Sequence, residues 1–298
     1  VSNMSNSDLM FSIVIPTYNR ANFVLKAVES YLQQDYSNFE IIVVDDGSTD
    51  STKNEVLAIK DKRVNYYYIQ NSERGAARNF GTRLAKGDYI NFCDSDDYVY
   101  KNHLTCACKF IAEEKPSVFH TGYNIISSDK IEFSENPSGV LNEFILRGNI
   151  LHVSSVFLKR EVALKYPFVE NRDLSGSEDW LQWLLLSANY DILGSNEITS
   201  AYVLHGDNSM FLAKGENTFK RINFLKKYLE ENVSFQNRYG SKMPVVSGSG
   251  DLLIALDFAL DKKKGKSLKF FVQSLFSDPS LIFSRRVFAV LKYILLRW

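Results

Sequence analysis

Short apolar runs alternate with longer amphipathic stretches between residues 11 and 93. Four runs have the length and composition of buried strands: Phe11–Ile15, Glu40–Val44, Val64–Ile69 and Tyr89–Cys93. We expect the first strand to end at Pro16, which has no N–H for a sheet ladder. Helical spacing of apolar residues marks the stretches between the strands: Ala21–Gln34, a segment from about Ser51, and Gly75–Lys86. This rhythm predicts βαβ units and an α/β fold with a mainly parallel sheet flanked by helices.

The pattern is mixed beyond Asn102 and helical after about Phe219. We expect strands at 118–126, 153–159 and 198–204, and helices at 141–146 and 178–189. The glycines and serines between Gly240 and Gly250, with Pro244, suggest a linker. The predicted division is therefore residues 1–102 and 103–218, two halves of one α/β domain, and residues 219–298, a helical C-terminal region.

Composition excludes several classes of protein. Thirty-five Lys and Arg balance thirty-five Asp and Glu, so the charge does not indicate a nucleic acid partner. Cys93, Cys106 and Cys108 fit neither a disulfide framework nor a zinc site, and we expect them to be reduced. Residues 1–8 lack the apolar core of a signal peptide. No uninterrupted apolar run reaches the roughly 18–20 residues of a membrane span. We expect a cytoplasmic location.

Polar clusters follow three of the expected strands. They are Thr17-Tyr18-Asn19-Arg20, Asp45-Asp46-Gly47-Ser48 and Asp94-Ser95-Asp96-Asp97. Ligands of parallel sheets bind at the carboxyl ends of strands, so one pocket can collect all three clusters. Three carboxylates in four positions repel one another unless a cation or solvent separates them, and oxygen ligands suit Mg²⁺ or Mn²⁺. The alternative is a solvated acidic turn or a helix N-cap.

Four motifs in this order resemble the donor-binding half of glycosyltransferase family 2, inverting enzymes with the GT-A fold. The motifs are Pro16-Thr17-Tyr18-Asn19-Arg20, Val44-Asp45-Asp46-Gly47-Ser48-Thr49-Asp50, Arg74-Gly75-Ala76-Ala77-Arg78-Asn79 and Asp94-Ser95-Asp96-Asp97. The likeness is dense over the first third of the chain and thinner as far as Ser209. The likeness implies that residues 1–102 form the half that binds the sugar donor and that residues 103–218 form the half that binds the acceptor.

The resemblance implies a role for each matching residue. Tyr18 would stack on the nucleotide base, and Asp46 would accept a hydrogen bond from the base. Arg78, and more weakly Arg74, would lie near the phosphates. Asp96 would ligate Mn²⁺ or Mg²⁺, and Asp94 would hold the ribose or a metal-bound water. The remaining donor-site residues in these motifs are Pro16, Thr17, Arg20, Asp45 and Ser95.

Two later segments complete the expected site. Glu178 and Asp179 open a predicted helix, where acidic residues also serve as ordinary N-terminal capping residues. They resemble the Glu-Asp motif of the family, which implies that Asp179 is the general base and that Glu178 positions the acceptor. His205 begins a segment that resembles a His-x-x-Asn-Ser motif and would reach the metal or the diphosphate. We expect His103, His120 and His152 to be structural.

The tail from Lys262 to Trp298 carries nine Lys and Arg and one acid, Asp278, a net charge of +8. Its apolar residues recur at helical spacing. Such helices either lie on an anionic membrane surface, at the inner face of the cell membrane, or pack on the catalytic domain or in a dimer contact.

The sequence thus predicts an inverting, metal-dependent glycosyltransferase that moves a sugar from a nucleotide diphosphate donor, with UDP-sugars favoured, to a saccharide hydroxyl in bacterial glycan assembly. The acceptor is free or lipid-linked. One alternative is transfer to polyprenyl phosphate, which needs no general base. Another is a catalytically silent nucleotide-sugar-binding or membrane scaffold protein, which has no need to keep Asp96, Arg78 and Asp179 together.

Overall fold

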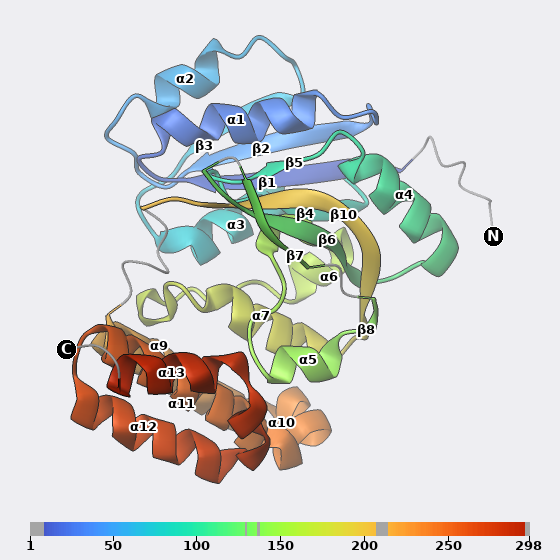
Figure 1. Ribbon diagram of the computed structural model, residues 1–298. Helices are drawn as coiled ribbons and strands as arrows, with labels where there is room; N and C mark the ends of the chain where they lie inside the picture. The colour runs from blue at the N-terminus through green and yellow to red at the C-terminus, as the bar shows by residue number, and fades with distance from the viewer. Residues whose placement is uncertain (1–8, 129, 136–137, 207–213, 296–298) are drawn as a thin grey trace. The chain divides into compact units, whose positions relative to one another are not determined.

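The computed structural model describes residues 9–128, 130–135, 138–206 and 214–295. Contacts divide the chain into two compact units (Figure 1). Unit 1 comprises Val1–Leu141, Leu151–Glu170 and Tyr190–His205, and unit 2 comprises Asn142–Ile150, Asn171–Asn189 and Gly206–Trp298. The expected boundaries at residues 102 and 218 stay predictions. The segments that hold α5 (Asn142–Leu146) and α7 (Glu178–Ser187) group with the C-terminal helices rather than with the sheet.

Unit 1 is built on a ten-stranded mixed sheet whose main path has the order β3-β2-β1-β4-β9-β6-β10-β5. These strands are β1 (Phe11–Thr17), β2 (Phe39–Asp45), β3 (Val64–Tyr68), β4 (Tyr89–Phe92), β5 (Tyr98–Val99), β6 (Val118–Ser127), β9 (Val156–Lys159) and β10 (Ile192–Leu204); β7 (Lys130–Glu135) pairs with β6 and β8 (Gly139–Val140) with β10. Four pairs of neighbouring strands are parallel: β1 with β2, β2 with β3, β1 with β4, and β6 with β10. The predicted α/β fold with a mainly parallel sheet is confirmed.

The two faces of β1 are covered by different helices. Phe11, Ile13 and Ile15 pack with α1 (Ala21–Leu32) and α4 (His103–Glu114) in one core cluster. On the other face, α3 (Glu73–Leu84) approaches Val14 so closely that a Cβ built on Gly81 would lie 2.4 Å from Val14 Cγ1. Unit 1 also contains α2 (Thr52–Ala58), η1 (Val153–Ser155) and α6 (Arg160–Lys165). This close approach brings α3 directly onto the central strand.

Two sequence predictions in this unit were wrong in detail. Strand β1 continues through Pro16 to Thr17, because Pro16 needs no N–H there: pairing with β4 runs from Phe11 to Val14, and Cys93 N–H donates to Val14 O at its end. Residues 153–155 form a short 3-10 helix, η1, rather than the start of β9. Strand ends depend on where the neighbouring strand stops, which local sequence does not report.

Unit 2 is helical. Its C-terminal helices are α9 (Gly215–Glu231), α10 (Val233–Tyr239), η3 (Gly240–Lys242), α11 (Met243–Leu260), α12 (Lys264–Ser277), η4 (Pro279–Phe283) and α13 (Arg285–Leu295). The linker expected at residues 240–250 is wrong, because α11 runs through most of it. Pro244 stands in the first helical turn, where its missing N–H costs nothing. A Cβ on Gly248 would lie 3.0 Å from Ser274 O, and one on Gly250 would lie 2.7 Å from Ile222 Cγ2, so the glycines allow close packing.

One helical stretch among the described residues, Val233–Leu260, has the length and mean hydropathy (1.4) of a membrane span. It is broken into α10, η3 and α11, and 61% of its most apolar window is buried inside the protein. This burial is typical of a core helix, because neighbouring helices already cover the apolar side chains.

Replacing Gly81 by Ala should destabilise the protein. Alanine favours a helix by about 1 kcal/mol over glycine, but here its Cβ would strike the fully buried, stiff Val14, and such overpacking costs about 1–3 kcal/mol. Gly265 in α12 is the matched control, since a Cβ there meets no atom within 4 Å. Urea unfolding followed by circular dichroism should show a loss for Gly81→Ala and no loss for Gly265→Ala; equal stabilities would refute the packing argument.

Candidate active site

The loops that follow β1 and β2 are joined by hydrogen bonds. Ser48 Oγ accepts from Asn19 N–H (2.8 Å), and Asn19 Oδ1 accepts from Thr49 N–H (2.8 Å). Asp45 is fully buried and accepts from Ser48 N–H and from the Tyr66 hydroxyl, each at 2.7 Å. Tyr18 stands at this edge with 49% of its side chain exposed. The edge therefore presents an accessible aromatic ring on an ordered loop.

Asp46 connects this edge to helix α3. Its carboxylate accepts from Ser72 N–H (2.7 Å) and Glu73 N–H (2.9 Å) at the N-terminus of that helix. Carboxylates are favoured at helix N-termini because they satisfy free N–H groups and complement the helix dipole. Asp46 therefore orients α3 towards the strand ends, in addition to the base-binding role that the sequence predicts.

Helix α3 delivers Arg78 to the fourth strand end. The Arg78 side chain is 1% exposed; it donates to Asp94 Oδ1 (2.7 Å) and lies 5.2 Å from the Phe168 ring centre. Asn79 holds Phe168 by accepting from its N–H (2.8 Å) and donating to its carbonyl (2.9 Å). Although burial raises the pKa of Asp94, the charges of Arg78 and Arg74 outweigh it and hold this pKa below its ordinary value.

Asp96 faces two nitrogen-bearing side chains from distant parts of unit 1. His205 Nε2 lies 3.1 Å from Asp96 Oδ2, and Arg20 approaches the same oxygen at 3.8 Å. Phe23 stacks on the His205 ring, with centroids 4.8 Å apart. The structure thus brings together the start of α1, the turn after β4 and the end of β10. Asn208 and Ser209, which continue the expected His205 motif, lie outside the described residues.

Asp97, which the sequence leaves without a role, is the most enclosed carboxylate of the turn. It is 2% exposed; its Oδ1 accepts from Val203 N–H (2.9 Å) and its Oδ2 lies 2.8 Å from His152 Nε2. Burial raises the pKa of Asp97 to about 6, although His152 opposes the shift. Asp97 therefore ties the acidic turn to β10 two residues before His205. Its partners His152 and Val203 are 55 and 106 residues away along the chain, so no local sequence pattern indicates this role.

Of the three histidines expected to be structural, His103 and His120 are fully buried and His152 is partly buried. His120 Nε2 accepts from His152 N–H (3.0 Å), and His103 lies between Thr199 Oγ1 (2.7 Å) and Asn91 Oδ1 (3.2 Å). Burial lowers the pKa of His103 to about 3, so this ring is neutral. Of the three, His152 is the one that contacts the acidic turn.

The side chains around Asp96 suit a divalent cation. A carboxylate and an imidazole at 3.1 Å are ligands that Mn²⁺ accepts, and Mg²⁺ commonly takes one or two carboxylates with phosphate oxygens and waters. Thr17 Oγ1, at the neighbouring strand end, is buried without a hydrogen-bond partner among the described residues. No group of three or more His, Cys, Asp or Glu in the described part of the chain is placed to hold a metal ion.

Glu178 and Asp179 begin α7 in unit 2. Glu178 is buried and accepts from Gly176 N–H (2.8 Å), which closes the preceding turn. Asp179 is partly exposed, and its Oδ2 accepts from Asn149 Nδ2 (2.7 Å). Trp180 anchors the helix by donating from Nε1 to Ile145 O (2.9 Å). Asp179 thus has a fixed, solvent-accessible carboxylate with an amide that orients it, an arrangement suited to proton transfer.

Comparison with known proteins gives a consistent match. The model of glycosyl transferase family 2 matches residues 12–158, a range that holds the first four motifs but neither Asp179 nor His205. The chain is 32% identical over 225 residues to the UDP-Glc:alpha-D-GlcNAc-diphosphoundecaprenol beta-1,3-glucosyltransferase WfaP of Escherichia coli, covering 73% of this chain and 86% of that protein. It is 30% identical over 210 residues to TuaG of Bacillus subtilis, a putative teichuronic acid biosynthesis glycosyltransferase, covering 67% and 81%.

Other relatives are longer. The chain is 31% identical over 230 residues to an uncharacterized glycosyltransferase of Rickettsia conorii. The aligned residues make up 76% of this chain and 38% of that protein. The fold resembles that of Staphylococcus aureus TarS residues 1–349 in complex with UDP-GlcNAc (TM-score 0.64, 20% identity, 91% and 92% coverage). It also resembles a Pyrobaculum calidifontis mannosyltransferase in complex with GDP-Man and Mn²⁺ (TM-score 0.59, 15% identity, 95% and 85% coverage).

Substituting Asp97 by Ala should strongly destabilise unit 1. The change removes the acceptor of Val203 N–H and the partner of His152 Nε2 in a partly buried environment, which costs about 2–4 kcal/mol. Asp97→Asn should cost less, because its amide oxygen still accepts from Val203 N–H. Urea unfolding of both variants measures the difference, with Asp35→Asn, at an exposed carboxylate of unit 1, as the control. An Asp97→Ala protein as stable as the wild type would refute the linking role.

Proposed function

Since the chain belongs to glycosyltransferase family 2, we propose that it is an inverting, metal-dependent enzyme that transfers a sugar from a nucleotide diphosphate to a saccharide hydroxyl. The observation that carries this proposal is the Asp96–His205 pair and, at the same edge of the sheet, the buried Arg78 paired with Asp94. In this proposal Asp96 would supply a carboxylate for the cation and Arg78 a fixed positive charge for the diphosphate.

The donor is a UDP-sugar in this proposal. WfaP is named for UDP-Glc, and TarS was solved with UDP-GlcNAc. The exposed Tyr18 ring offers a stacking face for the base. The Arg78 side chain is held in place by its hydrogen bond to Asp94 and its contact with the Phe168 ring. Its guanidinium group is therefore preorganised to bind an anion near Asp94.

Mn²⁺ or Mg²⁺ would be held by Asp96 and His205, with Asp94 indirectly involved, and would stabilise the departing diphosphate. The acceptor hydroxyl loses its proton to Asp179 as its oxygen attacks the anomeric carbon, and the bond between that carbon and the diphosphate oxygen breaks. Attack opposite the leaving group inverts the anomeric centre. Asn149 holds the Asp179 carboxylate in one orientation for this proton transfer, and Glu178 orders the preceding turn.

The acceptor in this proposal is a saccharide of a bacterial surface polysaccharide, carried on a lipid diphosphate. The names of WfaP and TuaG support this class. The most direct experiment screens UDP- and GDP-sugars for metal-dependent hydrolysis, and then tests lipid-linked saccharides and polyprenyl phosphate as acceptors. Donor binding without any turnover would favour a silent binding protein instead.

Asp96→Asn should weaken metal-dependent donor binding by about 10–100-fold, because it removes a charged metal ligand. Calorimetric titration of UDP in the presence and absence of Mn²⁺ measures this effect. Asp35→Asn, at an exposed carboxylate of unit 1, is the matched control and should bind as the wild type does. Wild-type binding that is unchanged by a chelator, or unchanged in Asp96→Asn, would contradict the metal role.

Asp179→Asn should lower kcat about 10²–10⁴-fold with nearly unchanged donor affinity, because the amide cannot take the acceptor's proton. The matched control is Asp173→Asn, at an exposed carboxylate six residues earlier on η2 (Arg172–Leu174). Steady-state transfer assays and UDP titration of both variants provide the comparison. Substantial turnover by Asp179→Asn would exclude this residue as the base.

A further inference from the structure

The basic tail does not extend from unit 2 as a free amphipathic segment. Its inward apolar residues pack against α11 in a separate core cluster made of Leu252, Ala255, Phe271, Leu281, Val287 and Val290. Ser267 Oγ also donates to Ala255 O (2.7 Å), which joins α12 to α11. The sequence left two alternatives for the tail, membrane contact and packing on the protein. Packing explains the apolar residues on its inward face.

A second set of apolar residues in the tail faces solvent. We call it the tail surface: Leu268 (51% exposed), Val272 (42%), Phe276 (84%), Ile282 (51%), Phe283 (87%) and Phe288 (64%). Phe276 and Phe283 are the two most exposed large apolar side chains among the described residues. Leu268, Val272 and Phe276 recur every four residues and so share one side of α12. Six exposed large apolar side chains between residues 268 and 288 make this part of the tail a candidate interaction site.

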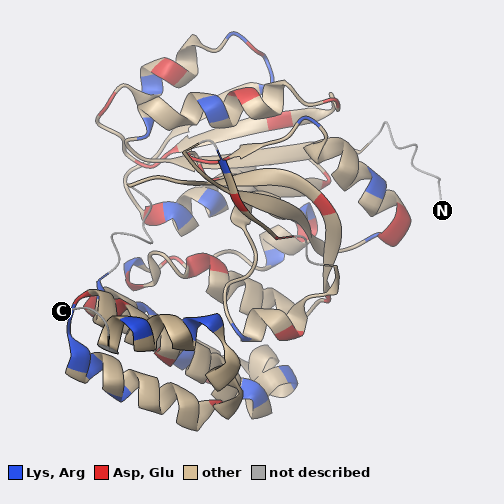
Figure 2. Ribbon diagram, in the orientation of Figure 1, with Lys and Arg blue, Asp and Glu red and all other residues tan. Residues whose placement is uncertain are grey.

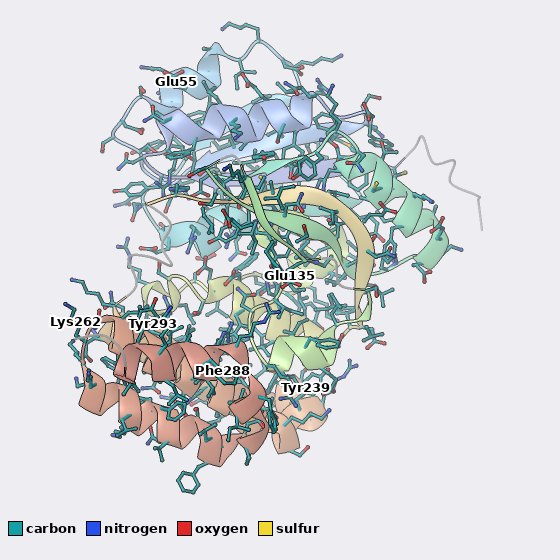
Figure 3. All side chains as sticks on the ribbon, in the orientation of Figure 1. Glu55, Glu135, Tyr239, Lys262, Phe288 and Tyr293 are labelled. Carbon is teal, nitrogen blue, oxygen red and sulfur yellow. The ribbon has the colours of Figure 1, made fainter. Side chains whose placement is uncertain are left out.

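The charges beside the tail surface are cationic. Arg285, Phe288 and Lys292 are exposed at the i, i+3 and i+7 positions of α13 and so share one face of this helix. Figure 3 labels Phe288 on α13, and Figure 2 shows basic residues on the same helix. The single acid of the tail, Asp278, is only 7% exposed and pairs with Arg147 at 3.1 Å. Asp278 is therefore withdrawn from the surface. Lys263 and Lys266 pair with Glu216 of α9, whereas Lys269, Arg285 and Lys292 are exposed cations.

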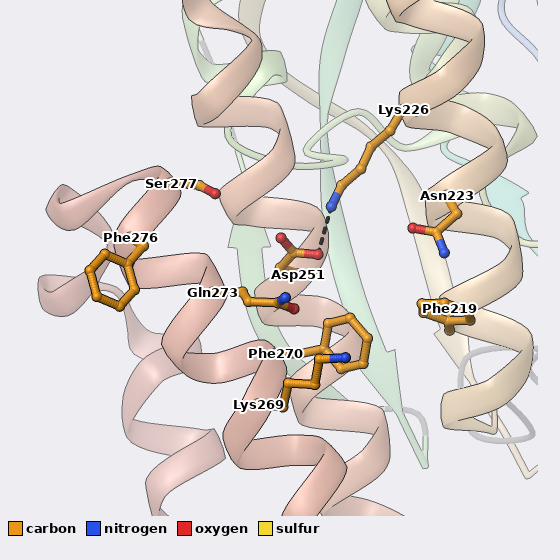
Figure 4. Close-up of a pocket in the computed structure, with 9 residues that line it drawn as sticks. All are labelled: Phe219, Asn223, Lys226, Asp251, Lys269, Phe270, Gln273, Phe276 and Ser277. Carbon is orange, nitrogen blue, oxygen red and sulfur yellow. Dashed lines mark hydrogen bonds and ion pairs between the residues drawn. The ribbon is translucent and has the colours of Figure 1, made fainter.

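A hollow of about 460 Å³ among α9, α11 and α12 adjoins the tail surface, and Phe276 and Lys269 line it (Figure 4). Inside it Lys226 is paired with Asp251 at 2.6 Å, which neutralises that cation. Lys269 is exposed and lies 5.7 Å from the Phe270 ring centre. The hollow thus adds a further cation beside the exposed aromatic residues.

We propose that the tail surface docks on an anionic lipid bilayer, with Phe276 and Phe283 inserted among the headgroups. Exposed aromatic and aliphatic side chains next to Lys and Arg are the composition that binds the membrane interface. Charge selects this occupant over a second copy of the chain, because two copies of one cationic surface repel each other whereas anionic lipids attract it. The proposal depends on unit 2 alone and not on the proposed transferase activity.

Co-sedimentation of the full chain with lipid vesicles tests this proposal without any substrate. The wild type should bind vesicles of phosphatidylglycerol mixed with phosphatidylcholine, and bind weakly to phosphatidylcholine alone. High salt should reduce the binding. The double variant Phe276→Ser, Phe283→Ser should lose about tenfold or more in vesicle partitioning, because it removes two inserted rings. Lys269→Glu with Lys292→Glu should also weaken binding, but only to anionic vesicles.

The matched control is the double variant Phe133→Ser, Phe144→Ser, which removes two exposed rings (42% and 58%) outside the tail. It should bind vesicles as the wild type does. Circular dichroism checks that each variant is folded, which we expect because both target rings are on the surface. An equal loss in the control, or full binding by Phe276→Ser, Phe283→Ser, would overturn the proposal. The proposal would also be overturned if the wild type did not bind vesicles and sedimentation velocity showed that it forms a dimer which Phe276→Ser, Phe283→Ser breaks.

Discussion

Three carboxylates within four residues of the turn after β4 repel one another, and the surrounding structure separates them by giving each its own partner. Asp94 is bonded to the buried Arg78, Asp96 faces His205 and Arg20, and Asp97 is turned inward to Val203 N–H and His152. Partners of opposite or complementary charge outweigh the repulsion that a bare acidic turn would suffer. These partners come from distant parts of the chain: residues 20, 78, 152 and 203–205. They can reach the turn only if the ends of α1, η1 and β10 and the helix α3 meet at this edge of the sheet.

Close packing makes this meeting possible. Gly81 allows α3 to lie against Val14, and the N-terminus of the same helix is bonded to the Asp46 carboxylate. One helix therefore connects Asp46, the proposed contact of the base, with Arg78, the proposed contact of the phosphates. Asn79 extends the connection by holding Phe168, whose ring lies against the Arg78 guanidinium. The charged groups of the proposed donor site are thus bonded to the backbone and to one another.

Unit 2 uses its helices in a different way. Gly248 and Gly250 let α11 pack closely against its neighbours, and the tail then folds back upon α11. This arrangement divides the apolar residues of the tail between an inner core and the tail surface. Association with a bilayer would concentrate the enzyme where a lipid-linked acceptor resides, so the two proposals agree although each stands on its own observations.

The sequence alone determined most elements of the sheet, the α/β class and the polar clusters at three strand ends, because hydrophobic periodicity reports local conformation and one-sided burial. The order of four motifs was also enough to indicate the family. Tertiary structure decided what periodicity cannot show. Asp97 received its role from His152 and Val203, which are 55 and 106 residues away.

The remaining errors have the same physical origin. Pro16 lies inside a strand because β4 has ended there, and residues 243–250 are helical because glycines fit against neighbouring helices. In the tail, sequence pattern identified basic amphipathic helices but not which apolar side chains pack inward. Phe271 is buried and Phe276 is exposed, although both belong to α12. Which face of a helix is covered depends on contacts far along the chain, and so the folded structure decides it.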